Sequence, residues 1–552
     1  MNSLKHISFR NPSLLAGFVL VSLAASAQDT ATIKKREVKV TSTFKPVLKE
    51  AAKINLNPTP PTADTTRPRL QYQVPNQNLQ FRLQPGSLKP LALKVDTGGR
   101  WDNESYIKAG YGSLKTPFLQ AGLSVGDGKT TGMNLYAKHI SSQGKRAYQD
   151  FSNTNVEAKG FLQTGNIEWN GSLGTDHETY YKYGFQPDSL KFSEDSLKVK
   201  FTTWKGRVSF HNINRTAYDI SYAPEVKVDV FNDRLKNSES NTYIYLPVRK
   251  TVGRIFEVDA AAEVNLTRFK PKDSSAINNN FVVLSPSVLF KTPNAFIQAG
   301  IKPSWNNGAF TVFPNVLAEF SIPNKQFTVQ LGWTGWLRNS GFQYTAGQNP
   351  WIYAPATIKN TRVEERYIGL KGSVGDHLNF SAKAAFNKLN DQPLFLNDSL
   401  TGKSFNVVYE SQMKVIHLGG EMGITVGERF SLISNLAVNK FTNLKDNSKA
   451  WGLLRTEFTT KARVQAMKDL YLTADLFAFD GPWYRDRQGD GNRQKGALDL
   501  GAGAEFKVYK NLKVWAQFNN LLNKEYQRWN QYPVYGFNLM GGIVFSFAQK
   551  HQ

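Results

Sequence analysis

The stretch YGFNLMGGIVFSF, residues 535–547, decides the fold class because its apolar residues recur with a period of two. In an extended chain, one face would carry Tyr535, Phe537, Leu539, Gly541, Ile543, Phe545 and Phe547. The other face would carry Gly536, Asn538, Met540, Gly542, Val544 and Ser546. Successive side chains of a β-strand point to opposite faces, so the stretch predicts a strand with one apolar face and one small or polar face.

Three further stretches, 498–508, 378–387 and 256–266, show the same alternation. Their polar faces include charged residues inside the pattern, such as Asp499 and Lys383. A charge at an interior strand position is costly in a dry core, but it is normal on the wall of a water-filled lumen. The alternation therefore favours a membrane barrel over a soluble β-sandwich.

The unit of an alternating segment and a turn repeats from Glu104 to Phe547, and short turns alternate with mostly longer polar loops. This is typical of bacterial outer-membrane barrels, whose short turns face the periplasm. The pattern predicts an all-β fold, a transmembrane antiparallel up-and-down β-barrel of about 22 strands with both termini periplasmic. Without a split at residues 231–254, where Pro247 interrupts the pattern, the count falls to about 20. The predicted strands cover residues 104–111, 117–125, 131–140, 152–163, 166–178, 199–211, 215–231, 240–249, 254–269, 279–291, 295–304, 309–322, 326–338, 362–374, 378–389, 412–426, 429–441, 449–466, 469–480, 494–508, 512–522 and 534–547.

The segments outside the barrel are distinct in composition. Residues 1–27 have a basic start, an apolar core and a small-residue site that ends at Ala27, as in a cleaved signal peptide. Residues 28–103 hold seven prolines between Pro58 and Pro90. Proline fixes φ and lacks a backbone donor, so a periplasmic tether is expected there, extended or partly occluding the lumen. The barrel would span residues 104–547, and residues 548–552 would form a C-terminal tail. The expected location is the outer membrane of a Gram-negative cell.

The chain contains no cysteine, which excludes disulfides and a lipid anchor built on cysteine. The formal net charge is +24, or 24 − 2 = +22 without Lys5 and Arg10 of the leader. We expect no nucleic acid as a partner of an exported chain. Three explanations of the excess cations stay open: a lumen that handles anions, an outer surface that faces lipid phosphates, and a solvated barrel rim.

Aromatic residues form 12% of the chain, and several stand where strands meet loops. Membrane barrels carry girdles of such rings at the level of the lipid headgroups. The aromatic pairs expected in these girdles are Trp333 and Trp336, Trp351 and Tyr353, Trp483 and Tyr484, Tyr526 and Trp529, and Tyr532 and Tyr535.

No catalytic or metal-binding motif stands out. The seven histidines are scattered without ligand-like spacing. His417 follows Glu410 and Ser411 closely, but ordinary strand residues explain this spacing without a hydrolase. The stretch DRQGDGNRQ, residues 486–494, resembles part of a calcium loop through Asp486, Asp490 and Asn492, but it lacks the distal glutamate. We therefore expect a turn there, and no enzyme, cofactor or metal.

The stretch FNNLLNKEYQRWNQYPVYGFNLMGGIVFSF, residues 518–547, resembles the closing strands of TonB-dependent outer-membrane receptors. The family's Asn-x-x-Asn-x-x-Tyr element is matched by Asn520, Asn523 and Tyr526. The resemblance implies a 22-stranded barrel that takes solutes across the outer membrane. It also implies a C-terminal signal for the barrel-assembly machinery, formed here by Tyr535, Phe537, Gly542, Phe545 and Phe547.

The segment REVKVTSTFKP, residues 36–46, is similar to the TonB-box region of Bacteroidota receptors, which implies TonB as a partner. The TonB-box-like residues are Glu37, Val38, Lys39, Val40 and Thr41. The family continues with a globular plug, whereas here only 104 − 28 = 76 residues precede the barrel. We therefore expect the plug to be missing or much reduced.

Two functions are compatible with these features. The first is a TonB-dependent-receptor-like barrel for solute uptake or passage across the outer membrane. The alternative is a structural or assembly subunit that binds partner proteins, such as a surface lipoprotein, through its tether and extracellular loops. In both cases outer-membrane lipids surround the barrel.

Overall fold

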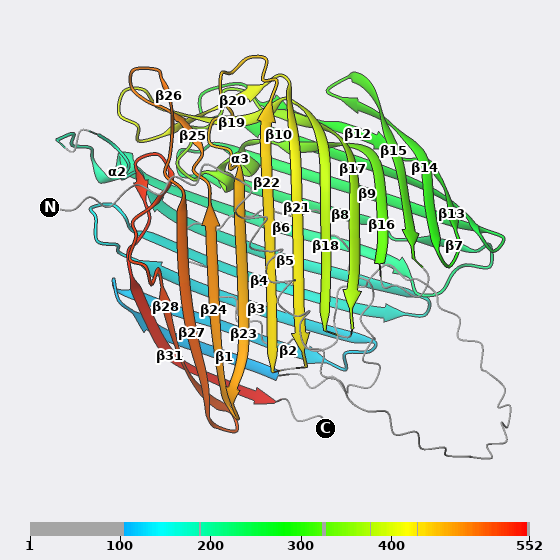
Figure 1. The fold of residues 1–552 in the computed structure, drawn as a ribbon, viewed down its shortest axis with the longest axis horizontal. Coiled ribbons are helices and arrows are strands. Elements are labelled where there is room, and N and C mark those ends of the chain that lie inside the picture. Colours follow the sequence, from blue (N-terminus) through cyan, green and yellow to red (C-terminus); the bar gives the residue numbers. More distant parts are fainter. Residues whose placement is uncertain (1–103, 187–188, 323–326, 376, 428, 549–552) are drawn as a thin grey trace, which may run out of the picture. The chain divides into compact units, whose positions relative to one another are not determined.

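A computed structural model of the protein describes residues 104–186, 189–322, 327–375, 377–427 and 429–548. Nearly all of them belong to one antiparallel β-barrel and its loops (Figure 1). In this part of the chain, no helix is long and apolar enough to cross a membrane. The expected signal peptide and tether, with the TonB-box-like residues Glu37 to Thr41, lie outside the described residues.

The barrel strands are β1 (Glu104–Gly112), β2 (Thr116–Gly126), β3 (Thr131–Ser142), β4 (Phe151–Thr164), β5 (Ile167–Tyr181), β6 (Lys198–Asn212), β7 (Ile220–Tyr222), β8 (Glu225–Asp233), β9 (Ser238–Val252), β10 (Phe256–Lys270), β11 (Ile277–Asn278), β12 (Phe281–Leu284), β13 (Ser287–Lys291), β14 (Ala295–Asn306), β15 (Ala309–Ser321), β16 (Phe327–Ser340), β17 (Lys359–Val374), β18 (Leu378–Asn390), β21 (Met413–Val426), β22 (Phe430–Thr442), β23 (Thr456–Met467), β24 (Leu470–Phe479), β27 (Ala497–Tyr509), β28 (Leu512–Asn519) and β31 (Asn538–Ala548).

The barrel is closed. Each strand pairs with its neighbour in antiparallel register, and β31 pairs with β1, as at Ile107 opposite Phe545. The short strands β7 and β8 share one position in the wall, and β11, β12 and β13 share another. The 25 strands of the sheet therefore make 25 − 1 − 2 = 22 positions. The predicted all-β, 22-stranded antiparallel barrel is confirmed.

Prolines mark the places where the wall is broken. Pro224 separates β7 from β8, and Pro286 separates β12 from β13, because proline lacks the N–H that a ladder needs. The continuous strands predicted over 215–231 and 279–291 are wrong at these points. The sequence pattern predicted an interruption at Pro247, but the strand that contains Pro247 is continuous. Pro247 lies within β9, beside the gap between β7 and β8, where no ladder donor is required.

The last strand confirms the predicted alternation. The outward side chains of Leu539, Ile543 and Phe545 are exposed, whereas Met540 and Val544 are buried on the inner face. Exposed large aliphatic and aromatic side chains also occur on the outward faces of the other strands, and together they form an apolar band around the barrel. Such a band is the surface that a membrane barrel presents to lipid. The outward face is therefore apolar where the inward face is small or polar.

Tyr535 departs from the predicted face. The ladder of β31 begins only at Asn538, so Tyr535 lies in the preceding loop. It is buried there, and its hydroxyl donates a hydrogen bond to the carbonyl oxygen of Gln149. The period of two ends where strand pairing ends, and loop packing then decides the direction of a side chain.

The two ends of the barrel differ. Short turns such as 165–166 and 468–469 lie at the end where β1 begins and β31 ends. The opposite end carries the longer connections (upper part of Figure 1). They hold α2 (Glu194–Leu197), α3 (Phe342–Gln348) and the hairpins β19 (Gln392–Asn397) with β20 (Phe405–Glu410), β25 (Trp483–Arg485) with β26 (Gly491–Arg493), and β29 (Gln527–Trp529) with β30 (Tyr532–Pro533). The predicted alternation of lengths fails at 113–115 and 307–308, which are short connections at the long-loop end.

A charge on the outward face is expected to destabilise the barrel. Leu418 of β21 is 51% exposed toward the hydrocarbon, and Glu421 is exposed on the opposite face of the same strand. We expect Leu418→Arg to lower the free energy of unfolding by about 2–4 kcal/mol. Glu421→Arg should change it by no more than about 1 kcal/mol. Urea unfolding in phospholipid vesicles measures both, and equal losses would contradict the assignment of the two faces.

Candidate functional site

The inner wall of the barrel carries ion pairs between strands. Lys383 of β18 lies 2.6 Å from Glu365 of β17, and Lys371 of β17 lies 3.0 Å from Glu319 of β15. On the other face of β18, Phe386 is 65% exposed. Paired charges inside and aromatic residues outside are the arrangement expected of a barrel with a hydrated lumen. This wall can line a path for a polar solute.

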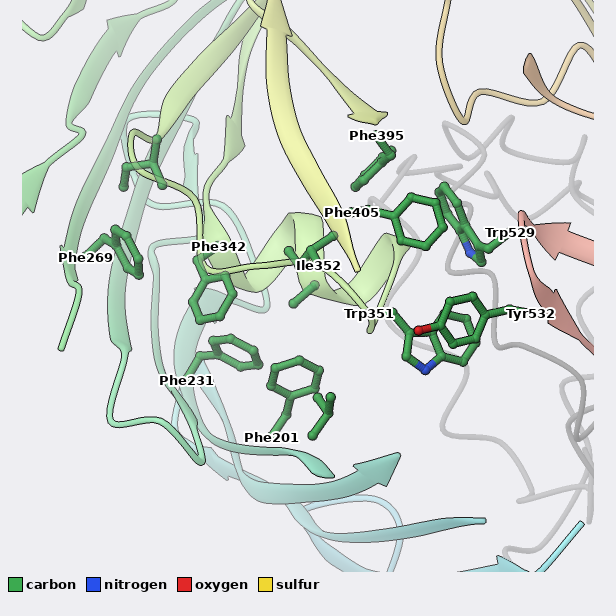
Figure 2. Close-up of a cluster of buried hydrophobic side chains, with 13 residues drawn as sticks. Phe201, Phe231, Phe269, Phe342, Trp351, Ile352, Phe395, Phe405, Trp529 and Tyr532 are labelled. Atoms are coloured by element: carbon green, nitrogen blue, oxygen red, sulfur yellow. The ribbon is translucent and has the colours of Figure 1, made fainter. Parts of the chain in front are cut away.

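The long connections fold together at one end of the barrel into a layer that we call the loop cap. The loop cap comprises residues 182–186, 189–197, 341–358, 391–412, 443–455, 480–496 and 520–537. Its centre is a continuous cluster of buried aromatic and aliphatic side chains (Figure 2). Loops that were expected to be solvated polar connections therefore have a hydrophobic core of their own.

The centre of the cluster is a stack of rings from loops far apart in sequence. Trp351 stacks on Tyr532 with ring centroids 4.0 Å apart and an angle of 26° between the planes. Tyr183 packs edge-on against Tyr532 at 4.9 Å, and Phe405 packs edge-on against Trp529 at 5.4 Å. Figure 2 shows the rings of Trp351, Tyr532, Phe405 and Trp529 grouped near α3. Two loops and two hairpins thus share a single packed interface.

The second part of the cluster joins the cap to the barrel wall. Phe342 of α3 packs against Phe231 of β8 at 5.1 Å and against Phe269 of β10 at 5.4 Å. Phe201 of β6 completes the group through an edge contact with Phe342 at 6.4 Å. All four rings are buried, so α3 is held against the inner surface of the strand ends.

Backbone hydrogen bonds also connect the loops of the cap. The amide of Tyr353 donates to the carbonyl of Phe405 at 2.9 Å, and the amide of Phe405 donates to the carbonyl of Trp351 at 3.1 Å. The amide of Phe395 donates to the carbonyl of Trp451 at 3.2 Å. Because these are main-chain contacts, the cap is a small folded unit and not a set of independent loops.

A buried carboxylate positions α3. Oxygen atoms of Glu239 in β9 accept hydrogen bonds from the amides of Phe342, at 2.5 Å, and Gln343, at 3.3 Å. These amides lack helical partners at the start of a helix, and the helix dipole favours an anion there. A Cβ at Gly341 would come too close to the Glu239 carboxylate, so a larger residue at this position would displace the carboxylate from its hydrogen bonds. The contact fixes the helix at the rim of the barrel.

A network of amide side chains on the inner wall connects β16 to β9 and β10, which lie five and four strand positions away around the barrel. The side-chain amide of Asn339 donates to Asn241 and to Thr267, both at 2.8 Å. The hydroxyl of Thr267 donates to Asn241 at 2.7 Å and to Asn265 at 2.8 Å. Asn241 and Asn265 lie on β9 and β10, so the network anchors the base of the α3 loop to the wall on another side of the lumen.

Glu410 anchors the loop of residues 443–455. Its carboxylate accepts from the amides of Lys445 at 2.6 Å, Asp446 at 2.9 Å and Asn447 at 2.9 Å, and from the Asn447 side chain at 2.9 Å. Burial opposes ionisation, but these hydrogen bonds outweigh it and hold the pKa of Glu410 below its ordinary value. The amide of Ser411 donates in turn to Asp446 at 2.9 Å. The group is a structural anchor for the cap.

One cation lies inside the loop cap. Lys182 is almost fully buried, with its Nζ 4.9 Å from the centre of the Tyr353 ring. Burial, with a smaller contribution from nearby Lys403, lowers the pKa of Lys182 to about 8, whereas Asp233 opposes the shift. The cap therefore presents cationic and aromatic groups together near its centre.

The residues singled out in the sequence do not form a reaction centre. Asp486 accepts hydrogen bonds from the Asp490 amide, at 2.8 Å, and from the side chain of Asn492, so it closes the β25–β26 hairpin as the expected turn. His417 faces Asn439 at 2.8 Å, apart from the Glu410 anchor. The described residues contain no group of three or more acidic, histidine or cysteine side chains that could hold a metal.

The aromatic girdle was predicted only in part. Trp333 is exposed on the outer wall, where the Arg366 guanidinium lies 4.9 Å from its ring centre. Trp351, Trp529 and Tyr532 are instead buried in the cap, so their assignment to the girdle is wrong. The sequence did contain a signal for the cap, namely the many aromatic residues inside the long loops. Loops that are fully solvated rarely carry so many apolar rings, because exposed apolar patches are unfavourable.

Solved structures with the same architecture are outer-membrane receptors and transporters. The iron transporter FrpB from Neisseria meningitidis superimposes with a TM-score of 0.62 at 11% identity, over 81% of each chain. The siderophore receptor PirA from Acinetobacter baumannii gives 0.62 at 9% identity, over 81% of this chain and 80% of that one. The ferric enterobactin receptor PfeA from Pseudomonas aeruginosa gives 0.60 at 11% identity, over 82% of each chain.

The class of fold is therefore the 22-stranded barrel of TonB-dependent receptors. No protein-family model and no curated protein matches the chain. At identities near one residue in nine, the likeness to FrpB, PirA and PfeA concerns the path of the backbone.

The Glu410 anchor predicts a pH-dependent loop. The pKa of Glu410 is depressed in the folded chain relative to about 4.3 in an unfolded one, so its contacts stabilise the loop above that pH and are lost as pH falls through the folded pKa. Protection of the Lys445, Asp446 and Asn447 amides against hydrogen exchange should be constant from about pH 7 to 5 and fall at lower pH. In Glu410→Gln the same amides should be less protected at neutral pH, with little further change on acidification. Unaltered protection in this variant would show that the carboxylate does not hold the loop, and Glu421→Gln is the control.

Proposed function

We propose that the protein is an outer-membrane barrel of the TonB-dependent-receptor type that takes up or admits a solute. The observation that carries this proposal is a closed 22-stranded barrel with an ion-paired inner wall and an apolar outer belt. Twenty-two strands enclose a lumen too wide to be filled by the wall's own side chains. Such a lumen serves passage only if its openings are controlled.

The loop cap supports this proposal because it lies at the end of the barrel with the long connections, which in bacterial barrels is the extracellular end. Its buried aromatic core restricts the mouth of the lumen, as controlled passage requires. The structural neighbours are, by their names, receptors and transporters of iron or siderophores, and this supports uptake as the activity.

The periplasmic side of the proposal rests on the sequence. We propose that residues 28–103 act as a reduced plug or tether after removal of residues 1–27, and that Glu37 to Thr41 engage TonB as in Bacteroidota receptors. A segment of this length and proline content can enter or leave a lumen without unfolding a globular domain. The C-terminal residues Tyr535, Phe537, Gly542, Phe545 and Phe547 would direct assembly of the barrel.

Conductance in planar bilayers tests the proposal. The full-length protein should conduct little, since both the tether and the cap restrict the lumen. Deletion of residues 28–103 combined with Trp351→Ala and Tyr532→Ala should give a large, steady conductance, because the stacked rings at the centre of the cap are removed. Deletion combined with Phe386→Ala is the matched control, since Phe386 lies on the outer wall and its loss leaves the cap intact.

A silent barrel in all of these variants would overturn the transport proposal. If such a barrel also co-purifies in stoichiometric amount with a surface lipoprotein, the alternative of an assembly subunit is favoured. Conductance and the presence of a co-purifying lipoprotein, both measured on the same preparation, therefore distinguish the two functions.

A further inference from the structure

The outward wall of the barrel is not uniform. A hollow of about 750 Å³ crosses β1 to β8 on the lipid-facing side. Its lining is almost entirely apolar, and large exposed side chains surround it, namely Ile107, Leu135, Val156, Leu173, Trp204 and Val230. We call this hollow the outer groove. Its lining residues come from eight neighbouring strands, β31, β1 to β6 and β8, which together span roughly 34 Å at seven strand spacings of about 4.8 Å.

Small residues form the floor of the outer groove. Ala121 pairs with Ala137 across β2 and β3, and Ala158 and Gly206 flank Leu173 across β4, β5 and β6. All four line the hollow. A Cβ at Gly206 would meet only Leu173 at 3.6 Å and the Val228 carbonyl at 4.0 Å, so glycine is not required there by the fold. The hollow is deep here because the side chains of its floor are small, and the backbone at Gly206 leaves room for a larger side chain.

A polar row borders the groove on the side of the long loops. His139 of β3 lies opposite Thr154, Thr154 lies opposite His177 of β5, and His177 lies opposite Thr202 of β6. The row faces outward, because His139 also lies opposite the exposed Leu119 of β2. The imidazole Nδ1 atoms are hydrogen-bonded to Thr154 at 2.8 Å and to Thr202 at 3.1 Å.

Two lysines extend this polar row toward the loops. Lys200 and Lys198 follow Thr202 at alternate positions of β6, so their side chains point to the same outward face. Lys198 lies 5.7 Å from the ring centre of Tyr181. Within the part of the chain that the structure describes, neither lysine forms an ion pair. The outer wall thus changes within a few residues from an apolar hollow to a cationic rim.

We propose that the outer groove binds a lipid of the outer leaflet, with its acyl chains in the hollow and an anionic, phosphorylated headgroup at the His139–His177–Lys200 rim. The depth order matches such a molecule, since the apolar part lies toward the centre of the membrane and the cations lie toward the headgroups. Lysines strengthen binding to an anionic lipid surface, and lysine binds phosphate as a point charge.

A second copy of the chain fits the groove less well. Two barrels in one membrane would pair around an axis along the membrane normal, which brings the same depth of each wall together. Lys198 and Lys200 of both copies would then face each other, and like charges repel most strongly away from water. A lipid phosphate instead neutralises them. This inference rests on the proposed outer-membrane location, but not on transport.

Native mass spectrometry of the full-length protein in detergent tests the inference. The probe is lipid A, a phosphorylated and multiply acylated disaccharide, and the comparison is the same molecule without its phosphates. The wild type should retain one phosphorylated lipid and bind the dephosphorylated form about tenfold or more weakly. Gly206→Leu fills the floor and should weaken both forms by a similar factor. The matched control is Gly420→Leu on the outward face of β21, where a Cβ meets only the Ser381 carbonyl at 3.9 Å.

A second pair of variants isolates the headgroup contact. Lys198→Gln with Lys200→Gln should abolish the preference for the phosphorylated form and leave binding of the dephosphorylated form unchanged. Lys414→Gln with Lys440→Gln, on the outward face of β21 and β22, should keep the preference.

Equal binding by the Gly206 and Gly420 variants, or no preference in the wild type, overturns the inference. A wild-type dimer that Gly206→Leu converts to monomers overturns it in favour of a second copy. Lipid binding without conductance would refute only the transport proposal, and conductance without lipid binding would refute only this inference.

Discussion

A backbone that crosses hydrocarbon finds no water for its N–H and C=O groups, so a sheet in a membrane must close on itself. Here β31 and β1 make that closure, and their approach is close enough that a Cβ at Gly542 would strike the Ala109 carbonyl. Trp515 of β28 covers the seam from inside, with its indole nitrogen donating to the Ala109 carbonyl at 3.3 Å. Without this seam there would be neither a lumen nor an outer belt.

Closure creates a second constraint, because a ring of 22 strands leaves its centre open. The chain meets this constraint at one end with residues from the long loops. The stacked rings of Trp351 and Tyr532, the helix held by Glu239 and the loop held by Glu410 form one packed unit over the strand ends. The loop cap has a core that is separate from the lipid-facing belt, so the two can change independently.

The outer belt is also more than an inert surface. Most of it consists of large side chains, but the wall from β1 to β8 is lowered by alanine and glycine and is bordered by a cationic rim. The lysines of the described residues therefore have at least two distinct locations, one inside the barrel, where they pair with glutamates, and one on the outer rim, where Lys198 lies against Tyr181. A sum of charges over the sequence does not separate these locations, whereas the strand register does.

The sequence by itself determined the barrel, because a period of two reports directly which side chains meet hydrocarbon and which meet water. The alternation in residues 537–547, the strand count and the faces of Asp499 and Phe506 all follow from that local rule. Only the tertiary structure decided where Tyr535, Trp351 and Tyr532 go, since loop residues carry no period and their direction depends on partners hundreds of residues away. The outer groove is likewise invisible along the chain, because its floor and rim come from a few positions on each of the five strands β2 to β6, which become neighbours only through register.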